Sequence, residues 1–189
     1  MDFSHYSDTP VQVAVDLVNT LDVVSSEENL NTPGDVADFI ETGVSDWDRV
    51  EFSPTERDLH ETRALRARLR EVFDAPDAAG AAETLNALLA DVHAVPRVSV
   101  HGDTPPHLHF EPESGGVARW LGAITAMGLS VALIEGGFNR FGHCASDTCD
   151  DVFVDTSKNR SRRHCSDTCT TRESVAAYRA RQRAGHPTR

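Results

Sequence analysis

Four cysteines near the end of the chain are the residues best suited to chemistry. Cys144 and Cys149 form a C-x4-C pair, and Cys165 and Cys169 form a C-x3-C pair after fifteen intervening residues. The 189-residue sequence contains no other cysteine. Two close pairs with a spacer of this length can surround one metal ion, because each pair brings two thiolates from one tight turn. The spacing therefore predicts one structural Zn²⁺ whose four thiolate ligands leave no position for water or substrate.

Two disulfides are the alternative use of four cysteines. The first eight residues contain neither the basic nor the apolar region of an export signal. We therefore expect a cytoplasmic protein whose thiols stay reduced and bind metal. We expect no enzyme, because the zinc would lack a free position and no nucleotide-binding fingerprint is present. No apolar stretch approaches the length of a membrane span, so a membrane partner is not expected.

Basic residues gather around the cysteines although the net charge of the chain is −12. Residues 1–137 hold 8 Lys and Arg against 24 Asp and Glu, whereas residues 138–189 hold 10 against 6. A basic surface can bind phosphates on an acidic protein, because charges farther apart than about 8 Å are screened at physiological salt. Alternatively, these arginines are simply solvated or neutralise the zinc thiolates. The candidate nucleic-acid-binding residues are Lys158, Asn159, Arg160, Arg162, Arg163, Arg172, Arg179 and Arg183.

The cysteines follow a long segment in which apolar residues recur mainly at helical spacing. Five helices are expected. The first begins at Thr9-Pro10, the second extends from Thr32-Pro33 to Gly43, and the third extends from Ser53-Pro54 to Pro76. The fourth ends at Pro96, and the fifth extends from Val117 through Ile134 to Gly136-Gly137. Ser53 is the expected N-cap of the third helix, with Glu56 completing a capping box. Ile134 is expected on the buried side of the last of these helices.

Residues 97–110 change to a period of two. Val98 and Val100 alternate with polar residues, and Leu108 and Phe110 do so after a turn at residues 102–106. This pattern predicts a β-hairpin with one apolar face. The fold class is therefore α+β, mainly α, with a helical N-terminal domain over residues 1–137 and a zinc domain over residues 138–189.

The zinc domain is expected to be a small treble-clef-like finger. Val152-Phe153-Val154 predicts one strand of a hairpin that returns through residues 162–164 to Cys165. The last helix is expected to begin directly after Cys169, with Thr170 and Glu173 as a capping box. Its inward stripe is expected to comprise Thr171, Val175, Tyr178 and Gln182. Because about 50 residues bury little surface alone, we expect this domain to be disordered without zinc.

Both ends of the chain resemble known families. The runs Cys144 to Cys149, Phe153 to Arg160, and Arg162 to Cys165 are similar to the CGNR zinc finger. The run Val13 to Thr20 resembles the opening of the ABATE domain, which usually precedes that finger. The resemblance implies a stress-induced bacterial transcription regulator whose zinc finger binds DNA. The Cys-Gly-Asn-Arg motif is here Cys169-Thr170-Thr171-Arg172, so only the arginine of the DNA-recognition motif carries over.

Further polar residues are weaker candidates for sites. Asp16 and Asn19 are three apart on a predicted apolar helix, and Thr20 follows them. These residues either satisfy backbone groups or other helices, or line a pocket for a small-molecule effector. The histidines expected on the polar face of the hairpin are His101, His107 and His109. We expect them to be exposed surface residues rather than ligands of a second metal. His143 and His164 adjoin zinc cysteines, but four cysteines already suffice.

Two rival functions remain open beside DNA binding. In one, zinc stabilises a protein-interaction module whose basic surface binds an acidic partner. In the other, the cysteines form a redox-responsive switch that releases zinc on oxidation. For a DNA-binding regulator, a homodimer would supply the paired half-sites that such proteins usually need.

Overall fold

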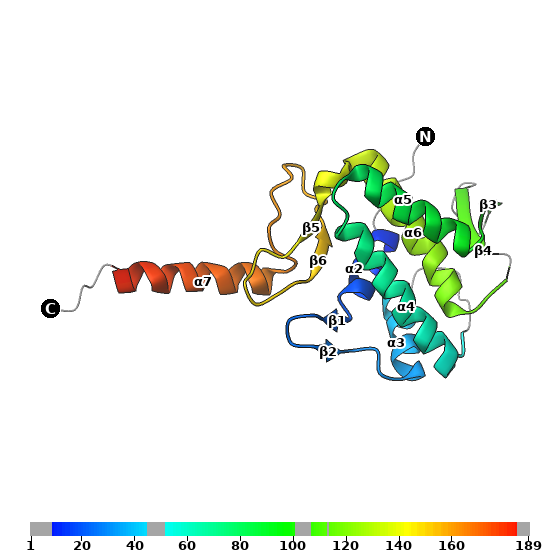
Figure 1. Ribbon diagram of the computed structural model, residues 1–189, viewed down its shortest axis with the longest axis horizontal. Coiled ribbons are helices and arrows are strands. Elements are labelled where there is room, and N and C mark those ends of the chain that lie inside the picture. Colours follow the sequence, from blue (N-terminus) through cyan, green and yellow to red (C-terminus); the bar gives the residue numbers. More distant parts are fainter. Residues whose placement is uncertain (1–8, 45–51, 101–106, 113, 185–189) are drawn as a thin grey trace.

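The computed structural model describes residues 9–44, 52–100, 107–112 and 114–184 (Figure 1). It is mainly helical and contains small antiparallel strand pairs, which confirms the expected fold class. The helices are α2 (Thr9–Val18), α3 (Pro33–Gly43), α4 (Glu56–Phe73), α5 (Ala78–Asp91), α6 (Val117–Gly136), the short 3-10 helix η1 (Phe138–Arg140) and α7 (Asp167–Ala184). The strands pair as β1 (Leu21–Asp22) with β2 (Glu27–Glu28), β3 (Ala94–Ser99) with β4 (His107–Pro112), and β5 (Phe141–His143) with β6 (Val152–Val154).

The core forms around α6, which α2, α4 and α5 contact. Leu121, Ile124 and Leu129 of α6 are fully buried, as are Leu17 of α2 and Leu69 of α4. The backbones of α2 and α6 approach closely at Gly128. A Cβ atom there would lie 2.5 Å from the Cβ of Pro10, so only glycine permits this contact.

Helix α6 corrects one expectation about the membrane. Val117–Gly136 is in fact long and apolar enough to cross a bilayer, with a mean hydropathy of 1.7. However, 67% of that window is buried inside the protein, as expected for the core helix of a soluble fold. Ile134 was expected on the buried side, but this residue of the last turn of α6 is 81% exposed.

The helix boundaries follow capping chemistry. Helix α3 begins as expected, with Thr32 as its N-cap and Asp35 completing the capping box. Helix α4 begins later than expected, because Thr55 and Asp58 form the box rather than Ser53 and Glu56. Asp58 also accepts a hydrogen bond from the backbone N–H of Val117, at 3.3 Å. This second partner, in the first turn of α6, favours the box that contains Asp58.

The hairpin β3–β4 is confirmed, but its surroundings differ from expectation. Helix α5 ends at Asp91 rather than at Pro96, because His93 adopts the left-handed conformation and Pro96 lies within β3. The expected apolar face is not buried at Val98, which is 73% exposed. An alternating pattern predicts a two-faced strand, but it does not guarantee that another element covers the apolar face.

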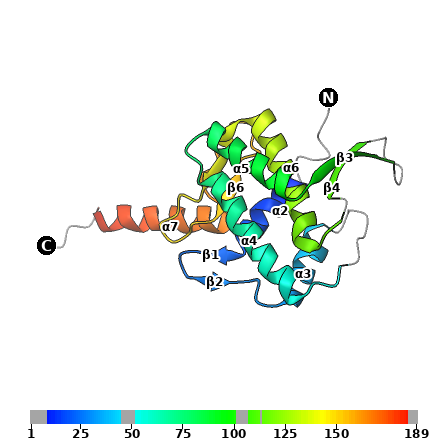
Figure 2. The ribbon, with the colours of Figure 1, turned by 45° about the vertical axis from the view of Figure 1, so that its right-hand side comes forward.

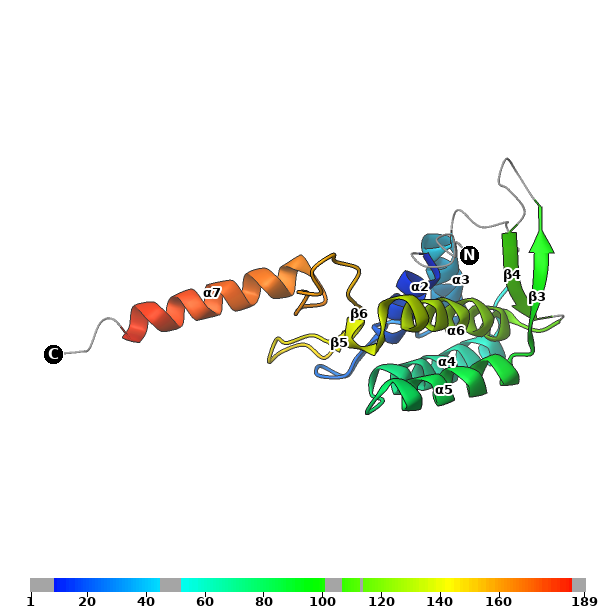
Figure 3. The same cartoon turned by 90° about the horizontal axis from the view of Figure 1, so that it is seen from above.

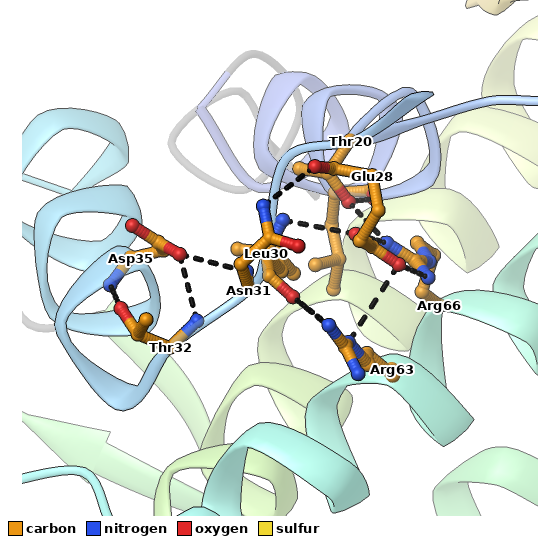
Figure 4. Close-up of polar contacts among 9 residues, drawn as sticks. Thr20, Glu28, Leu30, Asn31, Thr32, Asp35, Arg63 and Arg66 are labelled. Atoms are coloured by element: carbon orange, nitrogen blue, oxygen red, sulfur yellow. Dashed lines mark hydrogen bonds and ion pairs between the residues drawn. The ribbon is translucent and has the colours of Figure 1, made fainter. Parts of the chain in front are cut away.

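A buried arginine holds the β1–β2 loop against α4 (Figure 4). The guanidinium of Arg66 donates to both carboxylate oxygens of Glu28, at 2.6 Å each, and to the hydroxyl of Thr20 at 3.0 Å. One turn away, Arg63 donates to the backbone carbonyl of Leu30 at 2.8 Å. The hydrogen bonds from Arg66 lower the pKa of Glu28 despite its partial burial.

The residues from 138 onward, which we call the zinc segment, do not pack as a separate body. Val152 and Val154 of β6 belong to the same hydrophobic cluster as the helices of residues 9–136, and β6 contacts α2. Helix α7, in contrast, extends away from the other elements in all three ribbon views (Figures 1, 2 and 3). The division at Gly136-Gly137 stays a prediction, but hydrophobic packing crosses it.

Candidate metal centre and nucleic-acid interface

The first cysteine pair lies in the loop between β5 and β6. Cys144 follows β5, and its backbone N–H donates to the carbonyl of Asp151 at 2.8 Å. The N–H of Cys149 donates to the carbonyl of Ser146 at 3.1 Å, which closes the turn between the two cysteines. The sequence placed β6 in a hairpin with residues 162–164, but β6 pairs with β5 instead. That prediction missed Phe141–His143, a three-residue strand too short to show a period.

The second pair lies at the start of α7. This helix begins at Asp167, so Cys169 lies in its first turn and Cys165 just precedes it. The expected start after Cys169 is therefore wrong. The hydroxyl of Ser166 accepts the backbone N–H of Cys169 at 3.3 Å and acts as the cap. Glu173 instead accepts the hydroxyl of the buried Ser146 at 2.8 Å, and so joins α7 to the first cysteine loop.

The four thiols lie close enough together to share one ion. Their sulfur atoms all lie within 4.8 Å of one another, and none forms a disulfide. The Sγ of Cys165 lies 3.6 Å from that of Cys149 and 3.7 Å from that of Cys169. Tetrahedral zinc with Zn–S bonds of about 2.3 Å places its sulfurs about 3.8 Å apart. The arrangement fits one Zn²⁺ with four thiolate ligands, as the spacing predicted.

Burial and hydrogen bonds shift the pKa values of the thiols. Burial raises the pKa of Cys149 to about 12 and also raises the pKa of Cys165. Burial acts in the same direction on Cys144, but hydrogen bonds from the backbone of Cys165 and Ser146 outweigh it and lower its pKa. Several thiolates cannot coexist at this distance without a cation. Zinc binding must therefore displace protons, and its affinity rises with pH.

A polar network shapes the loop between β6 and α7. The buried carboxylate of Asp155 accepts the backbone N–H of Ser157 at 2.8 Å and that of Arg162 at 2.9 Å. Arg140 donates to the carbonyl of Asp155 at 2.6 Å. Arg162 donates to the carbonyls of His164, at 2.9 Å, and Cys165. The loop that carries the basic residues is therefore held by specific hydrogen bonds.

The candidate nucleic-acid-binding residues are all exposed. The arginine-rich loop and the first turn of α7 meet at a hollow of about 680 Å³. Its lining includes Arg162, Arg163, His164, Ser166 and Thr170, and also Asp155 and Asp167. Arg172 lies at the other cysteine pair, where it donates to the hydroxyl of Thr148 at 3.0 Å. Lys158, Asn159 and Arg160 lie at the turn after β6, whereas Arg179 and Arg183 lie farther along α7.

The apolar stripe assigned to the inner face of α7 is not buried. Val175 is 41% exposed and Tyr178 is 58% exposed. The hydroxyl of Tyr178 accepts a hydrogen bond from Gln182 of the same helix, at 3.2 Å. Helical spacing correctly placed these side chains on one face, but within the described residues no element packs against that face.

The three residues of the candidate effector pocket have different surroundings. Asn19 binds both backbone groups of Val152, accepting from its N–H at 2.8 Å and donating to its carbonyl at 3.0 Å. Thr20 donates to the carbonyl of Leu17 and accepts from Arg66. Only Asp16 lines a cavity among those described. The cavity that Asp16 lines includes neither Asn19 nor Thr20, and both of these residues follow the end of α2 at Val18 rather than lying within the helix.

The histidines have varied positions. His143 lies within 3.1 Å of a carboxylate oxygen of Asp74 and is not among the clustered metal-binding groups. His164 lines the hollow beside α7. His101 lies outside the described residues. For His107 and His109 the structure describes only the backbone, in β4.

Sequence reasoning missed one contact between the helices and the first cysteine loop. Arg70 of α4 donates to the carboxylate and the backbone carbonyl of Asp150, which adjoins Cys149. Nothing in the local pattern of α4 distinguishes Arg70 from the other arginines of that helix. This contact joins positions 80 residues apart, so only the tertiary structure reveals it.

Comparisons with known families agree with this architecture. Residues 12–135 match the profile of the ABATE family, which is described as "Putative stress-induced transcription regulator". Residues 140–182 match the CGNR zinc finger. A search of curated proteins finds no match. The first match ends at residue 135, and the second begins at residue 140, directly before β5 and the first cysteine pair.

Proposed function

Since this chain belongs to the ABATE family and carries a CGNR zinc finger, we propose that it is a zinc-dependent transcription regulator that binds DNA. The zinc segment, which has a treble-clef-like order of cysteine loop, strand and helix, is the DNA-binding part. The helical part transmits a signal or mediates assembly into a homodimer. No catalytic role is proposed, because all four cysteines serve as zinc ligands.

The hollow beside the zinc cluster is the observation that best supports DNA binding. Arg163 and His164 from the loop meet the hydroxyls of Ser166 and Thr170 at the first turn of α7. Arginine side chains and hydroxyls are groups that proteins use to contact DNA phosphates. The cysteines hold both sides of this hollow, because Cys165 adjoins the loop and Cys169 lies within α7. Zinc would therefore stabilise the geometry of the phosphate-binding surface.

Selection from a random DNA pool tests the proposal. Zinc-loaded protein should enrich a sequence motif, and the same protein with a chelator should not. If four to six phosphates are contacted, the logarithm of affinity against the logarithm of salt concentration should slope at about −4 to −5. Failure to bind any duplex in the presence of stoichiometric zinc would contradict the proposal.

A pair of variants separates DNA contact from general charge. Arg163→Gln should weaken binding and make the salt slope shallower by about one. Arg57→Gln removes another exposed arginine, which pairs with Glu61 on α4 far from the zinc segment in sequence. It should leave DNA affinity unchanged. Equal losses in both variants would indicate a non-specific charge effect.

A protein-binding role is the second candidate, and the exposed stripe on α7 favours it. Val175 and Tyr178 form an apolar strip beside Arg172 and Arg179 on a helix that projects from the body (Figure 3). A basic amphipathic helix of this kind suits an acidic protein groove. A complex that forms without DNA and is lost in Tyr178→Ser would support this alternative.

A further inference from the structure

A cavity lies where the helices of the ABATE segment meet the zinc segment. Its volume is about 750 Å³, within the range of small-molecule sites. Helix α2 contributes Gln12 and Asp16, α3 contributes Thr42, and the zinc segment contributes Thr156 and Arg162. Figure 1 shows α2 beside β6, and their contact forms part of the wall. We refer to this space as the α2–β6 cavity.

The cavity contains one anion and one cation that do not pair with each other. Asp16 accepts a hydrogen bond from Gln12 at 2.7 Å and has no cationic partner in the described part of the chain. Arg162 donates to two backbone carbonyls and lies over the ring of Phe153, at 5.1 Å from its centroid. Within the same ranges no carboxylate pairs with its guanidinium. Each group therefore lacks a partner of opposite charge within the described residues, and a ligand can supply one.

The rest of the wall suits a small, flexible molecule. Val15 and Val154 are buried residues that line the cavity and provide apolar contact. The hydroxyls of Thr42 and Thr156 can bind polar groups at its edge. Asp16 is an exposed side chain at the edge of the cavity, and the burial of its surroundings raises its pKa. A nearby positive charge would favour its carboxylate form.

We propose that the α2–β6 cavity binds a small zwitterion of the amino-acid class, with its ammonium group at Asp16 and its carboxylate at Arg162. Such a ligand bridges the two separated charges without adding net charge to the site. A carboxylate also matches the planar guanidinium donors of arginine. A simple amine or a simple carboxylate would satisfy only one of the two groups.

A ligand bound in this cavity would affect the backbone next to the metal centre. Arg162 donates to the carbonyls of His164 and Cys165, and Cys165 is a zinc ligand in the arrangement described above. A carboxylate that competes for the same guanidinium would alter these hydrogen bonds. The cavity is therefore placed to connect a metabolite signal to the loop that carries the basic residues.

A ladder of ω-amino acids tests the proposal on full-length, zinc-loaded protein. Isothermal titration calorimetry would compare glycine, β-alanine, γ-aminobutyrate, δ-aminovalerate and ε-aminocaproate, with butylamine and butyrate as single-charge controls. One or two chain lengths should bind saturably, and each single-charge control should bind about tenfold more weakly or worse. No saturable binding by any member up to roughly 10 mM would overturn the proposal. Equal binding by butylamine would overturn it as well.

Three variants locate the site. Asp16→Asn and Arg162→Lys should each weaken the best ligand by about tenfold or more, the first by removing the carboxylate charge and the second by removing the planar donors. Glu71→Gln, at an exposed position of α4 outside the cavity, should bind normally. Zinc content and thermal melting would establish that each variant folds. Unchanged affinity in a folded Asp16→Asn protein would place the ligand elsewhere. None of these measurements involves DNA, so they are independent of the proposed DNA binding.

Discussion

Among single residues, Thr62 carries a polar atom that the fold does not use. Its hydroxyl is fully buried on α4 and has no hydrogen-bond partner among the described residues. Thr125 of α6 is equally buried, but its hydroxyl donates to the carbonyl of Leu121 at 2.6 Å. A buried hydroxyl without a partner costs roughly 1–3 kcal/mol relative to its exposure to water.

This difference predicts opposite effects of the same substitution. Thr62→Val should raise the free energy of unfolding by about 1 kcal/mol, because it replaces an unpaired hydroxyl by a methyl group of similar size. Thr125→Val should lower it by about 0.5–1 kcal/mol, because a hydrogen bond is lost. Urea denaturation of both variants measures the two changes. A destabilised Thr62→Val protein would mean that the hydroxyl has a partner after all.

Glu28 makes stability depend on pH. Two hydrogen bonds from Arg66 hold the pKa of Glu28 below its ordinary value of 4.5. A carboxylate with a lowered pKa in the folded state contributes stability above its ordinary pKa. That contribution disappears as the pH falls through the lowered value. Acid also releases zinc from thiolates, so the informative quantity is the difference between two proteins at each pH.

Glu28→Gln should therefore be less stable than the wild type near neutral pH, and the gap should narrow as the pH falls below about 4.5. Chemical denaturation between about pH 6 and pH 3 would measure the gap. Glu83→Gln, at an exposed position of α5, should match the wild type throughout. A stability difference that stays constant with pH would show that the contact between Arg66 and Glu28 does not depend on the charge of Glu28.

At the scale of elements, Asn19 in the turn after α2 connects this helix to β6. Its side chain binds the N–H and the carbonyl of Val152, 133 residues away in the sequence. Asn19→Ala leaves both backbone groups partly buried and unpaired, so it should cost about 1–3 kcal/mol of stability. Asn159→Ala, in an exposed turn, should cost little. Thermal denaturation compares the two; equal melting temperatures would show that the contact contributes nothing.

Helices α3 and α7 show what sequence patterns can and cannot predict. Capping residues and helical spacing predicted α3 closely, because they act within one or two turns. The same spacing grouped Val175 with Tyr178 but could not show that their face of α7 lies open. Burial depends on whether another element reaches that face, and this is a property of the chain path rather than of the local pattern.

For the whole molecule, the shared core links zinc binding to the stability of the helices. Val152 and Val154 pack into the cluster that α2, α4 and α6 form, and only two residues separate Cys149 from the start of β6. Anything that binds only the folded state stabilises it by mass action. Removal of zinc should therefore destabilise the helical part as well as the tail. If residues 138–189 folded independently, only the tail would be destabilised.

Addition of a strong chelator should lower the main helical melting temperature followed by circular dichroism. Cys144→Ser should melt at a similarly lowered temperature and respond little to the chelator. An unchanged main transition, with only a small loss of helical signal from α7, would show that the zinc segment folds separately.

The sequence by itself determined the metal ligands, the type of most elements and the basic character of the tail. These features are encoded in local spacing: C-x4-C and C-x3-C bring thiols together through tight turns, and capping residues act on adjacent backbone groups. Only the tertiary structure decided that β6 pairs with β5, that Asn19 binds Val152, and that Asp16 and Arg162 share a cavity. Each of these contacts joins segments that are distant or too short to carry a period, and the packing of the common core selects them.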